Sequence, residues 1–319
     1  MDQGHIETEK LLVALERKIK KVSGEASKDL QRQADEYFAK FVKRDKEQQE
    51  LLKAGKITEE RYRQWRLAQM GRGKWFEAMR DSCAERVTHA NEIAVAYVNN
   101  DMAKVYALNR QFTIEDVQKQ SGDVLGGIDF VQYDEKTVKR LLVEEPDLMP
   151  HYPEEKALDR GIDLKWGKKQ ITDSITSGII RGSSIDQIAK DMTERISNMG
   201  KTSAIRAART AYTAAENAGR QDGAEELEQK GVILNKIWIA MIDSRVRHVH
   251  AEADGQEVDN GEPFVVGGEN MMFPGDASMG ASPWNLYNCR CTRETKVVGF
   301  KSILTDKQRK KANIRVVKW

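Results

Sequence analysis

The sequence predicts an α+β protein, in which a long helical N-terminal half is followed by a smaller α+β C-terminal module with a short antiparallel sheet. Three observations support this class. The six prolines lie in two clusters, at 146–153 and 263–283, and proline breaks helices, so 1–145 and 154–262 are free to be mostly helical. Apolar residues recur at three- and four-residue spacing in both stretches. Patterns typical of strands gather only after residue 231.

Length and composition limit the class further. The 319 residues suffice for about two domains, and 39% hydrophobic content is too high for wholesale disorder. No apolar run approaches the ~20 residues that cross a bilayer, and the N-terminus lacks a signal-peptide pattern. Three cysteines without framework spacing disfavour a disulfide-stapled secreted fold. We therefore expect a soluble protein, folded in a cytoplasm, with no membrane partner. The net charge of +2 says nothing about other partners.

The N-terminal half is expected to consist of amphipathic helices. The apolar stripe over 5–50 predicts long helix, and Thr58 is expected to cap a new helix that has acids in its first turn. We interpret Cys83 as a small core residue rather than a reactive thiol, because buried cysteine behaves as a hydrophobe. It belongs to a stripe at helical spacing, which we expect to be buried: Trp75, Met79, Cys83, Val87, Ala90, Ala94 and Tyr97.

Turn and proline signals predict the domain division. Residues 121–133 are turn-rich and could hold a short strand, and helix resumes over 134–145 before the proline cluster. We predict a helical partner-binding domain at 1–145, a Pro-rich linker at 146–160, a family domain at 161–300 and a basic tail at 301–319.

The second half is expected to contain three helices and then strands. Two helices, 171–179 and 185–196, are separated by the segment RGSS, in which Ser183 or Ser184 can start a helix. A third, Ala-rich helix at 202–230 ends at Gly231, where a left-handed cap belongs. The strands are expected at 232–241, 264–266 and 295–300.

The densest polar cluster follows the first predicted strand, on loops, where functional residues concentrate. Each member also has a structural interpretation: Asp243 and Asp254-Gly255 are typical turn formers, and Arg245 and Arg247 could be the solvated face of a short extended segment. The cluster consists of Asp243, Arg245, Arg247, His248, His250, Asp254 and Gly255, followed by Asn288, Cys289, Arg290 and Cys291.

Part of this cluster could bind metal. Imidazole and thiolate are good zinc ligands, and four of them make a closed structural site. His250 with Cys289 and Cys291 would supply three ligands, and His248 is an alternative or additional one. Ordinary packing or inert thiols remain the simpler interpretation, because Cys-x-Cys is a weaker signal than paired Cys-x-x-Cys motifs.

Catalysis has less support. The sequence has no nucleophile elbow, P-loop or His-Glu-x-x-His motif. Asp243, His250 and Cys289 could be assembled into a trio, but such trios occur in any chain of this length and need geometry to support them. We therefore expect no catalytic residues and no enzyme activity.

The C-terminal tail is strongly basic. From residue 296 onward the chain carries eight cations against one acid, Asp306, a charge that would attract DNA phosphates. The alternative is a solubilising terminus that docks one apolar strip. The predicted DNA-binding residues are Lys307, Arg309, Lys310, Lys311, Arg315 and Lys318.

These motifs, in this order, resemble a known family. Their order is Arg209-Thr210 and Asn217 on the Ala-rich helix, a strand, the run from Asp243 to Gly255, and Asn288-Cys-Arg-Cys. Over about 165–295 the chain resembles the head-morphogenesis domain of tailed phages, the Mu F-like minor head proteins. The chain departs from the family pattern by having Ala211 where many members have glutamate. It also has Arg247 and His250 where they have Cys-x-x-Cys, and Leu286 in place of a histidine, which leaves His250, Cys289 and Cys291 of a four-ligand site.

The resemblance implies a minor structural protein of the virion. Such a protein would lie in the capsid interior near the portal vertex, and in the host cytoplasm during assembly. It would act in head assembly and in DNA packaging or delivery, and it could be ejected with the DNA. The implied partners are the portal protein and double-stranded DNA, with scaffold or major capsid protein as further partners. The rival hypothesis is a delivered enzyme or effector that acts on nucleotide or nucleic acid through the polar loop cluster.

Overall fold

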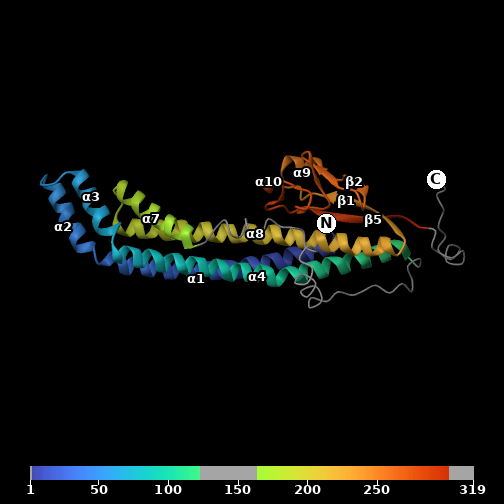
Figure 1. Ribbon diagram of the computed structural model, residues 1–319, viewed down its shortest axis with the longest axis horizontal. Helices are drawn as coiled ribbons and strands as arrows, with labels where there is room; N and C mark the ends of the chain where they lie inside the picture. The colour runs from blue at the N-terminus through green and yellow to red at the C-terminus, as the bar shows by residue number, and fades with distance from the viewer. Residues whose placement is uncertain (1, 123–163, 302–319) are drawn as a thin grey trace. The chain divides into compact units, whose positions relative to one another are not determined.

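The computed structural model describes residues 2–122 and 164–301 and confirms the α+β class (Figure 1). The predicted strand within 121–133 (beyond Gly122), the helix at 134–145, the linker and all six predicted DNA-binding residues lie outside the described residues. The helices are α1 (Gln3–Ala39), α2 (Val42–Lys53), α3 (Glu59–Met70), α4 (Lys74–Ser121), α7 (Leu164–Ile180), α8 (Ile185–Gln229), α9 (His248–Glu252) and α10 (Pro283–Leu286). The strands are β1 (Val232–Ile239), β2 (Glu257–Asp259), β3 (Phe264–Val266), β4 (Glu269–Met271) and β5 (Thr292–Phe300).

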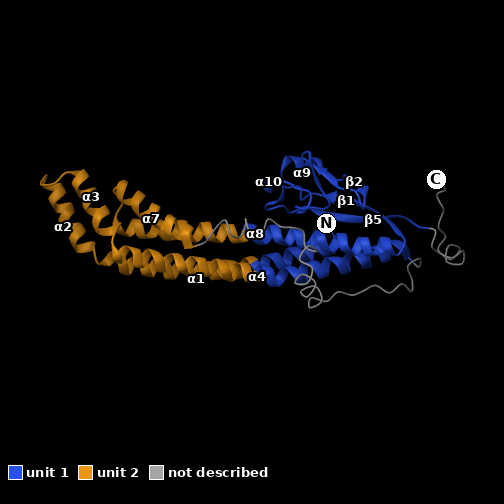
Figure 2. Cartoon of the chain, viewed as in Figure 1, with its two compact units in different colours: residues 1–15, 98–153, 206–319 blue, residues 16–97, 154–205 orange. Residues whose placement is uncertain are grey.

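The chain forms two compact units, and each is assembled from separate chain segments (Figure 2). Unit 1 contains 1–15, 98–153 and 206–319, and unit 2 contains 16–97 and 154–205. Both units take helices from before and after the predicted linker. The units therefore do not follow the predicted boundary between an N-terminal helical domain and a C-terminal module.

Unit 2 is a helical bundle around an apolar core. Its core joins the end of α1 and the start of α4 to α7 and the start of α8, through residues such as Phe38, Cys83, Ile175 and Met192. Cys83 is fully buried, and burial raises the pKa of its thiol to about 12, as expected of a core cysteine.

The predicted stripe on α4 is confirmed at Met79, Cys83, Val87, Ala90 and Ala94. Tyr97 is only half-buried, and the prediction for Trp75 is wrong, because 70% of this residue is exposed. Trp75 lies in the first turn of α4, and its ring faces the ammonium of Lys40 instead of the core.

The predicted capping residues lie at the helix ends, as expected, whereas some predicted helix lengths were wrong. The hydroxyl of Thr58 accepts the N–H of Arg61 at 3.2 Å, and Ser184 caps α8 by accepting the N–H of Gln187 at 3.2 Å. Gly231 ends α8 with φ of +93°, as predicted.

Two predicted helix lengths were wrong. The helix predicted over 5–50 is interrupted between α1 and α2, and the helices predicted at 185–196 and 202–230 form the single helix α8. Gly200 does not break α8, because a mid-helix glycine costs only about 1 kcal/mol.

Unit 1 packs two small antiparallel sheets with the remaining helix segments. The three-stranded sheet has the order β2-β1-β5, and β3 pairs with β4. The strands at 232–241, 264–266 and 295–300 are confirmed, with β5 starting three residues earlier. β2 and β4 were not predicted, because three-residue strands leave no periodic signal. Within the described ranges, no helix has an apolar stretch long enough to cross a membrane.

Glycine allows α8 to lie very close to α4 within unit 1. A methyl group at Gly219 would overlap the carbonyl oxygen of Tyr106, and one at Gly223 would lie 2.8 Å from the carbonyl oxygen of Arg110. On the other side of α8, Gly275 approaches the backbone of Ala214, where a Cβ would lie 3.1 Å from the Ala214 nitrogen. The small residues of α8 therefore fix how closely its neighbours pack.

Candidate functional site

One face of α8 carries a row of polar side chains that bind the main chain before and along β5. Thr210, Thr213 and Asn217 are spaced by three and four residues, so they lie on the same side of the helix. The hydroxyl of Thr210 accepts the N–H of Asn288 at 2.9 Å. The hydroxyl of Thr213 donates to the carbonyl of Cys289 at 2.6 Å. This row holds the segment that carries the two cysteines against α8.

Asn217 completes the row with both ends of its amide. Its Oδ1 accepts the N–H of Arg293 at 3.0 Å, and its Nδ2 donates to the carbonyl of Cys291 at 3.3 Å. Asn217 is fully buried, so both bonds are made away from water. Asn288 adopts a left-handed conformation with φ of +57°, which asparagine tolerates better than most residues.

The loop after β1 is held by carboxylates, as the turn-former interpretation predicts. Asp243 accepts the N–H of Arg245 at 2.8 Å and binds the guanidinium of Arg290 at two points, 2.6 and 2.7 Å. The Arg290 bond holds the pKa of Asp243 well below its usual range. Asp254 accepts the N–H of Ala240 at 2.8 Å.

The remaining family-motif residues also have mainly structural positions. Arg247 donates to the carbonyl of Tyr287, and Gly255 has φ of +77°, a conformation that favours glycine. Arg209 is half-buried on α8. Arg245 is different, because its side chain is 68% exposed.

His250, Cys289 and Cys291 form one buried cluster, as predicted. Their ligand atoms all lie within 4.8 Å of one another. His250 Nδ1 is 3.3 Å from the Cys291 sulfur and 3.5 Å from the Cys289 sulfur. All three residues are at most 3% exposed. The Trp238 ring packs edge-on against the imidazole, with centroids 5.7 Å apart.

Hydrogen bonds fix the orientation of the His250 ring. Its Nε2 lies 2.7 Å from Asn285 Oδ1. The Asn285 amide is itself oriented, because its Nδ2 donates to the Val266 carbonyl at 3.0 Å and to Glu269 Oε2 at 2.9 Å. Since Asn285 therefore presents oxygen to the ring, Nε2 carries a proton and Nδ1 faces the sulfurs.

The three side chains of this cluster change one another's pKa values. The hydrogen bond with Cys291, helped by His250 and opposed by burial, lowers the pKa of the Cys289 thiol well below its usual range. The same bond raises the pKa of Cys291. Burial alone would lower the pKa of His250, but the bond and charge of Cys289 together with the bond to Asn285 raise it.

The same donor set suits zinc. Zn–N and Zn–S bonds of about 2.0–2.1 and 2.3 Å place nitrogen about 3.5 Å from sulfur in a tetrahedron, close to the two distances found here. A hydrogen bond from the far ring nitrogen is typical of zinc-bound histidine, and Asn285 provides it. The cluster contains three ligands among the described residues, one fewer than a closed structural site has.

His248 lies outside the cluster, so its prediction as an alternative ligand was wrong. Its side chain is 85% exposed and pairs with Glu252 at 3.3 Å. The prediction assumed an extended segment, in which residues two apart share a face. The segment is instead the helix α9, where residues two apart point about 200° from each other.

A second buried cluster, which the sequence analysis missed, ties the start of α1 to α8. Asp2 binds the guanidinium of Arg220 at 2.6 and 2.8 Å, and His5 Nδ1 lies 2.8 Å from Glu216 Oε1. Glu216 also accepts the Thr292 hydroxyl at 2.7 Å. Burial alone would lower the pKa of His5, but the bond and charge of Glu216 raise it. No local signal could have found pairs separated by more than 200 residues.

In this site the polar motif residues of α8 bind main-chain groups of the segment before and along β5. Residues 169–294 match the Phage Mu protein F like family model. This match confirms the resemblance to the phage head-morphogenesis, or minor head, family over that segment.

Three curated relatives match this chain over 120 to 132 residues. Minor head protein GP7 of Bacillus phage SPP1 is 31% identical over 120 residues, which are 37% of each chain. An NAD(+)–arginine ADP-ribosyltransferase, EFV, of Enterococcus faecalis is 33% identical over 132 residues, 41% of this chain and 26% of that protein. An uncharacterized protein of Haemophilus influenzae is 27% identical over 132 residues, with the same coverage. The matches thus span 26 to 37% of the length of these relatives, and no solved structure matches the chain.

Proposed function

We propose that this protein is a non-enzymatic minor component of a tailed-phage head, located inside the capsid at the portal vertex, where it acts in assembly and in DNA packaging or delivery. One observation supports a structural role above all. Thr210, Thr213 and Asn217 direct their polar atoms to main-chain groups of 288–293. The family match and the SPP1 relative support the assignment to the phage head.

The proposed partner is the portal protein, bound through the N-terminal helices. The test is co-sedimentation of the intact chain with the portal oligomer of the same phage. We expect stoichiometric co-migration that survives moderate salt. The intact chain is needed because the segment 1–145 lacks part of both cores. Failure to co-migrate would exclude portal binding while leaving the family assignment intact.

The rival proposal, an enzyme acting on nucleotide, draws support from the relative named as an ADP-ribosyltransferase. The match covers only 26% of that relative, so most of that protein lies outside it. The test is incubation of the intact chain with NAD⁺ and an arginine-containing acceptor, with His250→Ala and the exposed His248→Ala as matched variants. We expect no turnover. Turnover that His250→Ala abolishes and His248→Ala keeps would favour the rival.

We further propose that His250, Cys289 and Cys291 hold a zinc ion that stabilises unit 1. Zinc would bind the two sulfurs as thiolates, so that binding releases thiol protons, and the imidazole would bind through Nδ1. Asn285 and Glu269 would keep the ring in the ligating orientation. In this proposal the metal joins the loop that carries the cysteines to α9, in addition to the bonds from α8.

A further inference from the structure

A corner of unit 2 gathers positive charge around an exposed tryptophan. Trp75, in the first turn of α4, is 70% exposed. The ammonium of Lys40, which directly follows α1, lies 3.9 Å from the centroid of the Trp75 indole. This contact places the segment between α1 and α2 beside the segment between α3 and α4 (Figure 1).

More cations lie close to these two residues in the sequence. Lys43 and Arg44 are in the first turn of α2, Arg72 lies between α3 and α4, and Lys74 begins α4; all four are exposed. We call Lys40, Lys43, Arg44, Arg72, Lys74 and Trp75 the basic corner.

The cations of the basic corner have no carboxylate partner among the described residues, whereas two arginines elsewhere in unit 2 do. Arg32 pairs with Glu36 at 2.9 Å, and Arg63 pairs with Glu59 at 2.9 Å. A cation that neutralises a phosphate releases counterions condensed on the nucleic acid, and a cation already paired with a carboxylate must first lose that partner. The basic corner therefore has an electrostatic gain available that paired arginines lack.

Trp75 indicates which polyanion fits. Lys40 covers one face of the indole, and the large exposed fraction leaves surface for a flat, apolar ligand. Unpaired bases stack on such rings while cations bind the phosphates. Bases in a duplex are already stacked, so a duplex gains from the cations alone. We propose that the basic corner binds single-stranded nucleic acid, with a base on Trp75 and phosphates on Arg72 and Lys74.

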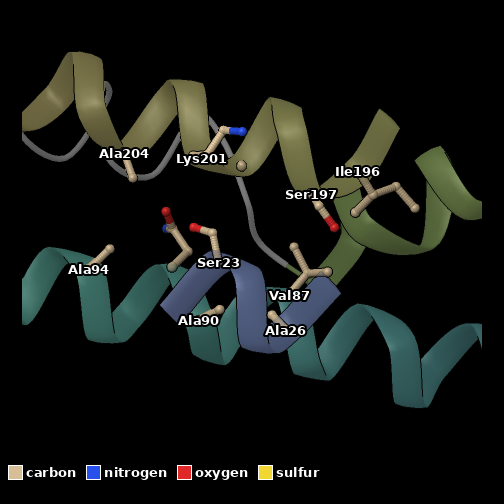
Figure 3. Close-up of a pocket in the computed structure, with 11 residues that line it drawn as sticks. Ser23, Ala26, Val87, Ala90, Ala94, Ile196, Ser197, Lys201 and Ala204 are labelled. Atoms are coloured by element: carbon tan, nitrogen blue, oxygen red, sulfur yellow. The ribbon is translucent and has the colours of Figure 1, made fainter. Parts of the chain in front are cut away.

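A hollow inside unit 2 is too small to bind a nucleotide. It lies between α1, α4 and α8, where small side chains such as Ala26, Ala90 and Ala204 face one another (Figure 3). Its interior of about 20 Å³ has room for about one water molecule. This hollow therefore does not compete with the basic corner for a nucleic acid.

The test measures anisotropy of a labelled 20-residue oligothymidine and a matched 20-base-pair duplex, with the full chain over a range of KCl concentrations. We expect Trp75→Ala to weaken oligothymidine binding about tenfold, the range that one stacked base gives, and to leave duplex binding within twofold. Trp75→Phe should restore part of the loss. Arg72→Ala with Lys74→Ala should flatten the salt slope for the single strand by about 1.4.

Matched controls come from the same chain. Trp284→Ala removes another exposed tryptophan, 51% exposed in unit 1, and Arg32→Ala with Arg63→Ala removes two paired cations. Both should leave oligothymidine binding unchanged. Equal loss of single-strand and duplex binding in Trp75→Ala would overturn the proposal. So would disappearance of the Trp75 effect when 302–319 are deleted, or competition by poly-glutamate as strong as that by oligothymidine, which would indicate an acidic protein as the partner.

Discussion

The amide of Asn217 on α8 holds the main chain of Arg293 on β5, with Oδ1 accepting the Arg293 N–H at 3.0 Å. The other end of the same amide binds the carbonyl of Cys291. One helix side chain thus sets the position of the strand relative to the His–Cys cluster, which is why we treat the family motif as structural.

Replacing Asn217 with alanine should destabilise the protein strongly. Two buried main-chain groups would lose their partners, and each such loss costs about 1–3 kcal/mol, so we expect about 3 kcal/mol in urea unfolding. Asn235→Ala is the control, because Asn235 makes its bond to Glu257 at an exposed position, and it should change stability by less than about 0.5 kcal/mol. Equal effects of the two changes would contradict the structural role of Asn217.

Zinc content tests the metal proposal. Protein purified without chelator should contain about one equivalent of zinc, and Cys291→Ser should lose it and lower the melting temperature. Cys83→Ser is the matched control, since Cys83 is buried in unit 2 away from the cluster, and it should keep the metal. Metal-free wild-type protein that melts no higher after zinc is added would refute the proposal.

Stability should depend on pH through His5. Glu216, Glu9, Asp2 and Arg220 face this histidine, and its pKa is raised in the folded state. A raised folded pKa gives stability that is fully present below about pH 6.5, the ordinary value, and is lost as pH rises through the folded value. His5→Gln should therefore be destabilised most at pH 5.5, by about 1 kcal/mol, and progressively less at higher pH.

The control for this prediction is His89→Gln, at an exposed histidine beside Glu92. Melting curves at pH 5.5, 7 and 8.5 provide the measurement. A difference between wild type and His5→Gln that stays constant over this range would show that His5 does not bind as the imidazolium.

A methyl group at Gly219 should disrupt the contact of α8 with α4, because it would overlap the carbonyl oxygen of Tyr106. We expect Gly219→Ala to cost about 1–3 kcal/mol, as overpacking usually does. Gly24→Ala should instead stabilise by about 0.5–1 kcal/mol, since Gly24 lies inside α1 and nothing lies within 4 Å of a Cβ there. Chemical denaturation of the two variants decides the sign.

A separate experiment tests whether the basic tail contacts duplex DNA. Deleting 302–319 should flatten the dependence of duplex affinity on salt, because each lost phosphate contact removes about 0.9 from the slope. Trp75→Ala should leave that slope unchanged. A truncated chain with the wild-type slope would remove the tail from DNA binding without affecting the proposal for the basic corner.

Short-range features were predictable from the sequence, because their causes are local. Thr58, Ser184 and Gly231 act within one helical turn. The grouping of His250 with Cys289 and Cys291 joins residues 39 and 41 positions apart, and it was predicted from ligand chemistry and the family resemblance instead. The error at His248 arose because a helix of only five residues, α9, replaced an expected extended segment. Two residues are then enough to turn a side chain to the opposite side.

Long-range features were not predictable. Asp2 and Arg220 lie 218 positions apart, and neither residue carries a signal that names the other. Asn285 belongs to no motif, yet it fixes the ring of His250 through the fold that brings α10 to β3 and β4. Tertiary packing brings such partners together, and a single sequence carries no signal for it.

The discontinuous build of unit 1 determines the order in which the chain can fold during synthesis. The residues that build the core of unit 2 have all been translated once residue 205 is made. Asp2 and His5 can form their bonds only after Glu216 and Arg220 have been synthesised. Asn217 on α8 can bind β5 only after about seventy further residues have been made. The start of α1 is thus among the last parts of unit 1 to find its partners, and the partly folded chain is most exposed to misfolding until β5 has been made.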